Sequence, residues 1–430
     1  MFQLANESHR EPLMSNVVVA ARARCALIVL CLLLGTAPAL ADTVVATVPV
    51  GNNPYGVAVL PDGTRAYVAN FTTDNVSVID TITNAVTATI PVGSHAYGIG
   101  AHPNGTRVYV TNAGSNTVSV IDTATNTVTA TIPVGTQPQS IAVRPDGTRA
   151  YAANTGTSTV SVIDTATNTV TATIPVGGDP LAVAVLPNGT RAYTASGSQN
   201  TVSVIDTATN TVVATIPVGN APYAVAVRPD GARAYVANSG TDNVSVIDTA
   251  TNTVTTTITV GNSPRGVAFR PVGTRAYVAN YGANTVSAID TVTNTVTATI
   301  PVGAFPYGVA FKPDGARAYV VNYISYTVSV IAIGPQVTAL SPGNGPAVGG
   351  TVVTLTGINF TGATAVNFGA IPAASFSVVS DTQITATSPA ASLGIVDVTV
   401  TTPDAISVNT AADDYNYDTL PVTLQAFDVE

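Results

Sequence analysis

The sequence repeats itself at one fixed interval, the step from Gly51 to Gly93, through most of its length. One glycine and one tyrosine mark the same two places in every copy. The glycines are Gly51, Gly93, Gly135, Gly177, Gly219, Gly261 and Gly303, and the tyrosines are Tyr67, Tyr109, Tyr151, Tyr193, Tyr235, Tyr277 and Tyr319. A fixed period of about 40 residues is typical of repeat architectures, in which each copy forms one structural unit.

Each copy contains four short runs of Val, Ile, Thr, Ala and Tyr between turns rich in Gly, Asn, Asp and Pro. In the copy that starts at Gly93, Val128, Ala130 and Ile132 alternate with threonines, which is the period of a strand with one buried face. Four antiparallel strands in about 40 residues predict a propeller blade. Residues 42–334 are therefore predicted to form an all-β, seven-bladed β-propeller, with a β-solenoid or a row of separate sandwiches as the weaker alternatives.

The two ends of the repeat region predict how the ring closes. Residues 42–50 match only the fourth run of a copy, and the seventh copy stops at Gly334 without its fourth run. The N-terminal strand is therefore predicted to complete the last blade by pairing with residues 328–331. Such closure removes two open sheet edges, which otherwise invite aggregation.

Residues 1–41 have the features of a secretory signal peptide. Arg22 and Arg24 precede a short apolar run, and Ala39-Leu40-Ala41 provides small residues before a cut at Asp42. The apolar run is too short for a stable spanning helix. The sequence predicts export to the periplasm, the cell surface or the medium, with Met1 or Met14 as the start and no transmembrane segment after cleavage.

Removal of this segment leaves an acidic chain without cysteine. Twelve basic residues remain (15 less Arg10, Arg22 and Arg24) against 22 acidic ones (24 less Glu7 and Glu11). This balance disfavours nucleic acid as a partner, and the loss of both cysteines excludes disulfides and thiolate chemistry.

The repeat period ends at Gly334. Residues 335–418 read as short alternating strands between Gly, Pro and Asn turns, which predicts one immunoglobulin-like β-sandwich. The segment has no Lys or Arg and carries much of the negative charge. Residues 419–430 are interpreted as a tail.

Two resemblances follow from these motifs. The stretch from Tyr109 to Asn112 reads YVTN, and the other copies read YVAN, YAAN, YTAS or YVVN at the same place, so the repeats resemble the YVTN-repeat, WD40-like seven-bladed β-propeller family. This resemblance implies an exported protein, and the family is similar to the seven-bladed lactonases.

Residues 335–418 resemble an IPT/TIG domain through Gly349-Gly350-Thr351, the GINF run that ends at Phe360, and Phe368-Gly369. That resemblance implies a binding or spacer module.

Charged residues that recur in the copies are interpreted as structural. Arg65 is predicted to face Asp80 across a hairpin and to form an ion pair with it, and the same holds in the other copies up to Asp290. Arg144, Arg228 and Lys312 are predicted to pair locally with the aspartate two residues on. His95 and His102 are candidate metal ligands or bases, but an exposed role is favoured.

An enzymatic function finds little support in these residues. Glycosidase chemistry needs paired carboxylates, and lactonase-like chemistry needs a metal or a His/Glu set; the repeats contain only turn-type aspartates. The sequence predicts no catalytic residue, no cofactor and no metal site.

Differences between copies indicate where a partner binds, because the shared residues report the scaffold. Once the ring closes, copies six, seven and one are adjacent, and they carry an excess of aromatic residues with one arginine at the funnel mouth. The candidate binding residues are Tyr55, Phe71, Arg265, Tyr281, Phe305, Tyr307, Tyr323 and Tyr326. Exposed aromatic side chains with arginine are typical of binding hot spots, and tyrosine rings also stack on sugars.

The sequence thus predicts a non-enzymatic, secreted or cell-surface binding or structural protein, whose funnel face and immunoglobulin-like module meet a protein or glycan of the cell envelope. The alternative is a lactonase-like or sensor propeller that binds a small ligand in the central funnel.

Overall fold

The computed structural model describes residues 42–402, 406–407 and 409–419. The predicted signal peptide and all but the first residue of the predicted tail lie outside this part of the chain. Within it, no helix is long and apolar enough to cross a membrane.

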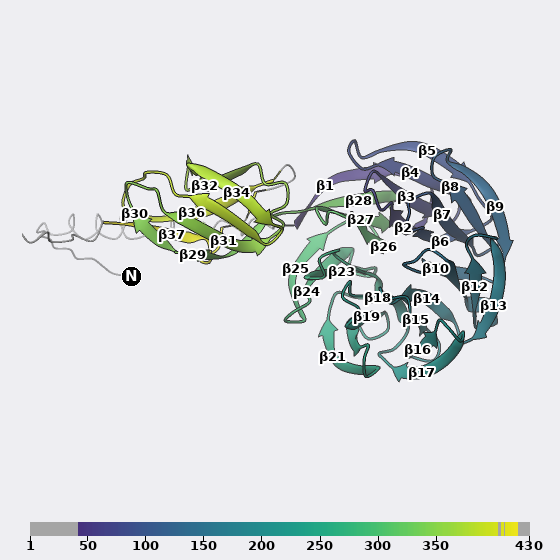
Figure 1. Cartoon of the computed structure of the whole chain (residues 1–430). Helices are drawn as coiled ribbons and strands as arrows, with labels where there is room; N and C mark the ends of the chain where they lie inside the picture. Colours follow the sequence, from purple (N-terminus) through teal and green to yellow (C-terminus); the bar gives the residue numbers. More distant parts are fainter. Residues whose placement is uncertain (1–41, 403–405, 408, 420–430) are drawn as a thin grey trace, which may run out of the picture. The chain divides into compact units, whose positions relative to one another are not determined.

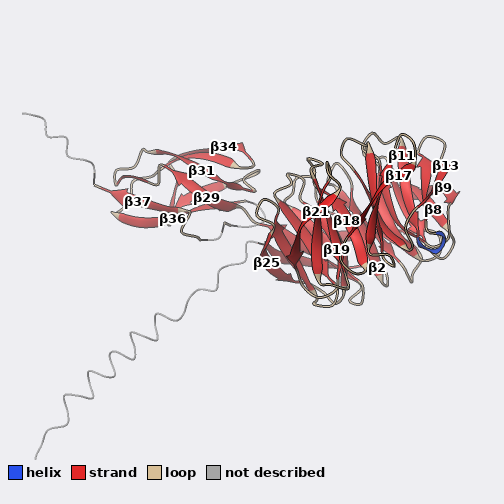
Figure 2. Ribbon diagram, turned by 90° about the horizontal axis from the view of Figure 1, so that it is seen from below, coloured by secondary structure: helices blue, strands red, loops and turns tan. Residues whose placement is uncertain are grey.

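Seven four-stranded antiparallel sheets follow one another around a ring (Figure 1). The first three blades are β2 (Pro54–Val59) to β5 (Ala85–Pro91), β6 (Ala96–Ala101) to β9 (Thr127–Pro133), and β10 (Pro138–Val143) to β13 (Thr169–Pro175). Their middle strands are β3 (Arg65–Asn70), β4 (Asn75–Asp80), β7 (Arg107–Asn112), β8 (Thr117–Asp122), β11 (Arg149–Asn154) and β12 (Thr159–Asp164). A short 3₁₀ helix, η1 (Thr155–Thr157), joins β11 to β12 and is drawn in blue in Figure 2.

The next three blades repeat the arrangement. They are β14 (Pro180–Val185), β15 (Arg191–Ser196), β16 (Thr201–Asp206) and β17 (Thr211–Pro217); β18 (Pro222–Val227), β19 (Arg233–Asn238), β20 (Asn243–Asp248) and β21 (Thr253–Thr259); and β22 (Pro264–Phe269), β23 (Arg275–Asn280), β24 (Thr285–Asp290) and β25 (Thr295–Pro301). The seventh blade supplies β26 (Pro306–Phe311), β27 (Arg317–Asn322) and β28 (Thr327–Ile333).

Ring closure occurs as the sequence predicts. Strand β1 (Asp42–Pro49) pairs antiparallel with β28 and completes the sheet β1-β28-β27-β26. Val44 lies opposite Ile331 and Val48 opposite Val328. Val48 is buried while the neighbouring Thr47 is exposed, so the apolar side of this strand faces the core. The seven-bladed propeller with a closing N-terminal strand is confirmed.

The core of the propeller lies between blades. Tyr67 is fully buried, and its cluster joins residues of the first blade, such as Val76, to residues of the second, such as Val108 and Ile121. The Tyr67 hydroxyl donates to Asn126 Oδ1 of the second blade at 2.9 Å. The YVTN-type tyrosine therefore packs one blade against the next, which explains why it recurs with the period.

The predicted Arg–Asp ion pairs are wrong, although their register is right. Arg65 does lie opposite Asp80, but its Nη1 donates to the Thr123 carbonyl of the next blade at 2.5 Å. The Asp80 carboxylate instead accepts the backbone N–H groups of Ile82 and Thr83, at 3.0 and 2.8 Å, and these bonds lower its pKa. The turn after Asp80 presents backbone N–H donors that are already fixed in place, so binding them orders no second long side chain. Arg65 is therefore free to donate to a carbonyl of the next blade.

The predicted local pairs within turns are confirmed. Arg144 lies 2.9 Å from Asp146 and Lys312 lies 2.9 Å from Asp314, and Arg228 pairs with Asp230.

One of the blade-joining arginines has a different partner. Arg65 binds the carbonyl of Thr123, and the equivalent residue for Arg275 is Ile333. The other blades have threonine at this repeat position. Arg275 Nη1 instead donates to both carboxylate oxygens of Asp42, at 2.8 and 2.6 Å. Asp42 is only 2 % exposed, so the first residue of the closing strand forms a buried ion pair with the sixth blade.

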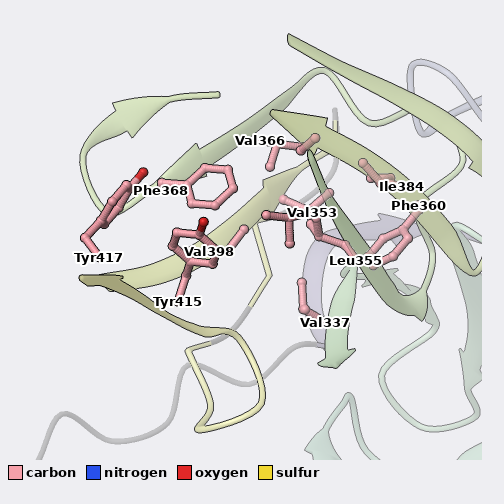
Figure 3. Close-up of a cluster of buried hydrophobic side chains, with 12 residues drawn as sticks. Val337, Val353, Leu355, Phe360, Val366, Phe368, Ile384, Val398, Tyr415 and Tyr417 are labelled. Atoms are coloured by element: carbon pink, nitrogen blue, oxygen red, sulfur yellow. The ribbon is translucent and has the colours of Figure 1, made fainter. Parts of the chain in front are cut away.

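Residues after the propeller form a two-sheet sandwich, as predicted. One sheet orders β29 (Gln336–Ser341), β31 (Val352–Ile358), β35 (Gln383–Thr387) and β34 (Ser375–Ser380). The other orders β30 (Asn344–Pro346), β37 (Asp414–Asp418), β36 (Gly394–Thr401), β32 (Ala365–Phe368) and β33 (Ile371–Pro372). Figure 3 shows the core between them, where Phe368, Tyr415 and Tyr417 pack edge to face.

Candidate functional site in the propeller funnel

Two loops of each blade meet on the same face of the ring. The loop that enters the innermost strand accepts a hydrogen bond from the loop that joins the second and third strands. In the first blade Phe71 N–H donates to the Asn53 carbonyl at 3.0 Å, and in the seventh Tyr323 N–H donates to the Phe305 carbonyl at 3.0 Å. Residues after the second strand thus stand beside the start of the innermost strand, as the sequence predicts.

Innermost strands project one variable side chain each toward the centre. Tyr55, Tyr97, Tyr223 and Tyr307 occupy the second position of β2, β6, β18 and β26, and Arg265 occupies it in β22. We call these five residues the aromatic plug. The Tyr97 hydroxyl lies 2.6 Å from that of Tyr223 and also contacts that of Tyr307. Tyr97 and Tyr223 are three blades apart, so this contact crosses the ring.

The rings and the guanidinium of the plug pack face to face and edge to face. Tyr55 stacks on Tyr97 with ring centroids 4.1 Å apart and meets Tyr307 edge-on at 4.4 Å. The Arg265 Cζ lies 4.5 Å from the ring centroid of Tyr223, and Arg265 Nη1 donates to the Tyr307 hydroxyl at 3.3 Å. Cation–π and aromatic contacts of this kind hold the centre of the ring rigid.

Burial in the plug makes phenolate formation unfavourable. It raises the pKa of Tyr55, Tyr97 and Tyr223 above the usual value near 10, and the neighbouring phenols raise the pKa of Tyr97 further. Tyr55, Tyr97 and Tyr223 are therefore neutral hydrogen-bonding groups, not general bases, near neutral pH.

Most of the predicted binding residues come together, but in contact with each other instead of forming a free surface. Tyr307 is only 6 % exposed. Tyr281 packs on Phe305 at 4.7 Å and lies under Arg265, whose Cζ is 4.1 Å from its ring centroid. Tyr323 packs on Tyr55 at 5.0 Å. Tyr326 stands apart in the turn before β28, with 40 % of its surface exposed.

Beside the plug the funnel is open. A cavity of about 950 Å³ lies mainly over the first three blades. It is lined by Tyr55, Phe71, His95, Tyr97, Ala113, Gly114, Asn116, Thr136, Gln137, Gln139, Gly156 and Tyr223. The aromatic residues of blades six and seven fill their side of the funnel, whereas the small residues Ala113 and Gly156 leave space over blades two and three. Along the inner strands a second cavity of about 170 Å³ continues the channel.

The cavity combines an aromatic wall with neutral polar groups. Phe71 and His95 stack with ring centroids 4.3 Å apart and an angle of 12°. Asn116, Thr136, Gln137 and Gln139 provide amides and a hydroxyl. Gln139 Oε1 is buried and accepts no hydrogen bond from the described residues. None of the lining residues is Asp, Glu, Lys or Arg, so the site suits a neutral ligand with an apolar face and hydroxyl groups.

Part of this site lies outside the residues that the sequence predicts. Tyr97 and Tyr223 occupy the same repeat position as Tyr55 and Tyr307, and this shared position could have identified them. They are not predicted because they lie outside the three blades with the excess of aromatic residues. Gln139 gives no such signal, because its own blade lacks aromatic residues at these positions.

His95 is exposed in its loop, as expected, while His102 is half-buried with Nε2 3.0 Å from the Gly147 carbonyl.

Known protein families match both parts of the chain. Residues 121–301 match the family described as "Lactonase, 7-bladed beta-propeller", and residues 335–418 match "IPT/TIG domain". The chain therefore combines a seven-bladed β-propeller, which is similar to that family over residues 121–301, with an immunoglobulin-like IPT/TIG domain, as its repeats and glycine motifs indicate. These two modules are compatible with binding or structural roles.

Among solved structures, the chain is similar to one titled hydrazine synthase, from Kuenenia stuttgartiensis. The two are 26 % identical with a TM-score of 0.61, over 65 % of this chain and 95 % of the other. No curated protein sequence matches the chain.

Proposed function

We propose that this protein is an exported, non-enzymatic binding protein whose propeller funnel holds a neutral glycan segment of the cell envelope. The funnel is the recognition site in this proposal, and the IPT/TIG domain is a spacer or second binding module. Of the protein and glycan partners that the sequence leaves open, the lining of the cavity favours the glycan.

The observation that carries the proposal is the composition of the 950 Å³ cavity. Sugar rings have apolar C–H faces that stack on aromatic side chains, and hydroxyl rims that need amide and hydroxyl partners. Phe71 and Tyr55 offer ring surface, while Asn116, Gln137 and Gln139 offer donors and acceptors. A buried Gln139 carbonyl without a donor is ready to accept a sugar hydroxyl.

The rigidity of the plug supports binding without large rearrangement. Tyr55 and Tyr97 form one wall of the cavity and both contact Tyr307, whose hydroxyl accepts a hydrogen bond from Arg265. A preformed wall loses little conformational entropy when a ligand settles on it, which favours affinity.

A second candidate function is favoured by the family match of residues 121–301. A lactonase-like or sensor propeller would place a small ligand in the same cavity. Acid–base hydrolysis needs a general acid or base, and His95 is the one histidine, and the one side chain of the usual catalytic type, among the residues that line the cavity. Lactone turnover that depends on His95 would favour this second candidate.

The test begins with the purified chain on an array of neutral and acidic oligosaccharides and on immobilised envelope polysaccharide. Binding to neutral glycans, without turnover of a panel of lactones, is the expected result. Ala113→Trp should abolish binding, because the indole occupies the cavity without removing a wall residue. Ser239→Trp is the matched control, since Ser239 has the same repeat position in the fifth blade and does not line the cavity.

Equal binding by wild type and Ala113→Trp would contradict the placement of the ligand in the cavity. Lactone hydrolysis lost in His95→Ala would replace the binding function with the enzymatic one. Binding that survives Ala113→Trp but is lost when Tyr281, Tyr307 and Tyr323 are together changed to Ala would move the site to the predicted aromatic sector.

A further inference from the structure

Three carboxylates gather at one edge of the sandwich domain. Asp397 in β36 lies directly opposite Asp414 in β37, and Asp413 immediately precedes β37. One carboxylate oxygen from each residue lies within 4.8 Å of the other two. Among the described residues no other set of three acidic, histidine or cysteine side chains is this close together.

This arrangement is unfavourable for a chain on its own. Like charges directly opposite each other on neighbouring strands destabilise a sheet. Residues 335–430 contain no Lys, Arg or His that could neutralise the group from within the domain. The Asn409 amide, which donates to Asp397 Oδ2, is a neutral partner.

Asp413 provides the second, independent observation. Its side chain is fully buried, with 0 % exposure. The Asp413 Oδ1 accepts the N–H of Thr410 at 2.8 Å and the Thr410 hydroxyl at 3.3 Å. Its Oδ2 is also buried but accepts no hydrogen bond from the described residues. A buried carboxylate oxygen without a partner is costly, so such oxygens are usually paired or coordinate a metal.

We propose that Asp397, Asp413 and Asp414 form a binding site for a hard divalent cation, with Ca²⁺ as the ion that fits best. A cation at this point converts the mutual repulsion of the three carboxylates into attraction and gives Asp413 Oδ2 its missing partner. This site lies in the sandwich domain and does not depend on the function proposed for the funnel.

The donor set selects the class of ion. All candidate ligands are oxygens, which suit Ca²⁺ and Mg²⁺, whereas Zn²⁺ and Cu²⁺ favour nitrogen or sulfur ligands. Ca²⁺ accepts six to eight oxygens in variable geometry, and Mg²⁺ requires a near-ideal octahedron. Asp397 and Asp414 come from facing strands and Asp413 from the turn before β37, and such an irregular set matches the tolerant ion better. Water and the oxygen of the Asn409 amide, turned over, would complete the shell.

The competing explanation is a shared proton. Burial raises the pKa of Asp413 and of Asp397, and the facing Asp414 carboxylate raises that of Asp397 as well. Protonation would remove the repulsion without a metal. The two explanations predict opposite responses to calcium at neutral pH.

The experiment uses Tb³⁺, which replaces Ca²⁺ and emits when a nearby tyrosine is excited. The chain has no tryptophan, and Tyr415 follows Asp414 directly, so excitation of tyrosine reports occupancy of this site. We expect Tb³⁺ emission that Ca²⁺ displaces with a dissociation constant on the order of 10⁻⁴–10⁻³ M, the range of extracellular modules. At 10 mM Ca²⁺, about 10 to 100 times that constant, the melting temperature of the sandwich should rise by about 6–20 °C.

Variants of the full chain separate the explanations. Asp397→Asn and Asp414→Asn should each weaken Ca²⁺ by about tenfold or more, while Asp418→Asn, four residues along the same strand, should not change it. Without calcium the same two variants should melt no lower than wild type, because they relieve repulsion. Absence of displaceable Tb³⁺ emission, or equal emission from all variants, would overturn the proposal. Stabilisation by Mg²⁺ with none by Ca²⁺ would overturn the assignment to calcium.

Discussion

The buried ion pair of the closing strand offers a strong test of how the ring is held shut. Asp42 is 2 % exposed and gives both carboxylate oxygens to Arg275, which is 8 % exposed. The change Asp42→Ala removes the carboxylate but leaves the guanidinium inside the protein. We expect this single change at the edge of the propeller sequence to destabilise the whole ring.

The magnitude follows from the charge that is left behind. Removing one partner of a buried ion pair destabilises a protein by about 3–5 kcal/mol, because the remaining charge is buried without compensation. In large domains 1 kcal/mol shifts the melting temperature by about 2 °C, so a decrease of about 6–10 °C is expected. The double change Asp42→Leu with Arg275→Met should recover most of it, since apolar replacement of a buried pair is often neutral.

Calorimetry measures the melting temperature, and hydrogen exchange locates the damage. Amides of β28, which pair with β1, should exchange faster in Asp42→Ala than in wild type, while amides of β16 on the far side of the ring should not change. A melting temperature within about 1 °C of wild type, or a double variant as unstable as the single one, would show that the buried charge of Arg275 does not control the stability of the ring.

Three further predictions concern the plug, the inner strands and the blade junctions. Because burial raises the pKa of Tyr55 and Tyr97 above the unfolded value near 10, their contribution to stability is present below pH 10 and is lost as the pH rises further. Absorbance of phenolate should therefore show some tyrosines titrating only as the ring unfolds, and complete reversible titration near pH 10 would contradict this. A Cβ on Gly266 would stand 2.0 Å from the Tyr307 carbonyl, so Gly266→Ala should destabilise by about 1–3 kcal/mol in denaturant titration; Gly343→Ala, whose nearest contact is 4.0 Å away, is the control. Arg149→Met should cost about 1.5–3 kcal/mol through loss of its bond to the Thr207 carbonyl, less than Asp42→Ala, and a larger loss would reverse the ranking of the two contacts.

The fold is predictable because the same pattern of strand runs and turns occurs in seven copies of the repeat. Period, strand alternation and the spare run at 42–50 specify blade number and closure without any side-chain detail. The repeat pattern does not predict which groups the charged side chains bind. Arg65 and Asp80 face each other, as the hairpin register requires, yet each binds a backbone group instead. Register depends on local spacing, whereas the choice of partner depends on the neighbouring blade.

The candidate site is predictable only in part for a related reason. In the predicted aromatic sector, the residues of blades six and seven mark where the funnel is filled, although the sequence alone favours an exposed surface there. Tyr307 is buried because side chains from seven inner strands converge on one axis, which leaves room for only some of them. The open cavity therefore lies mainly over blades one to three, where the small residues Ala113 and Gly156 stand. Likewise, the carboxylates of Asp397 and Asp414 meet only through strand pairing.

The most direct measurement compares two aromatic pairs at the same repeat positions. Phe71 and His95 line the cavity, whereas their counterparts in blades six and seven, Tyr281 and Phe305, do not. The affinity of wild type and of each double alanine variant for the same immobilised envelope polysaccharide is measured by calorimetry or surface plasmon resonance. We expect Phe71→Ala with His95→Ala to weaken binding by about tenfold or more, about 1.4 kcal/mol or more, and Tyr281→Ala with Phe305→Ala to weaken it far less. Equal losses, or a larger loss from the second pair, would contradict the proposal that the open side of the funnel is the binding site.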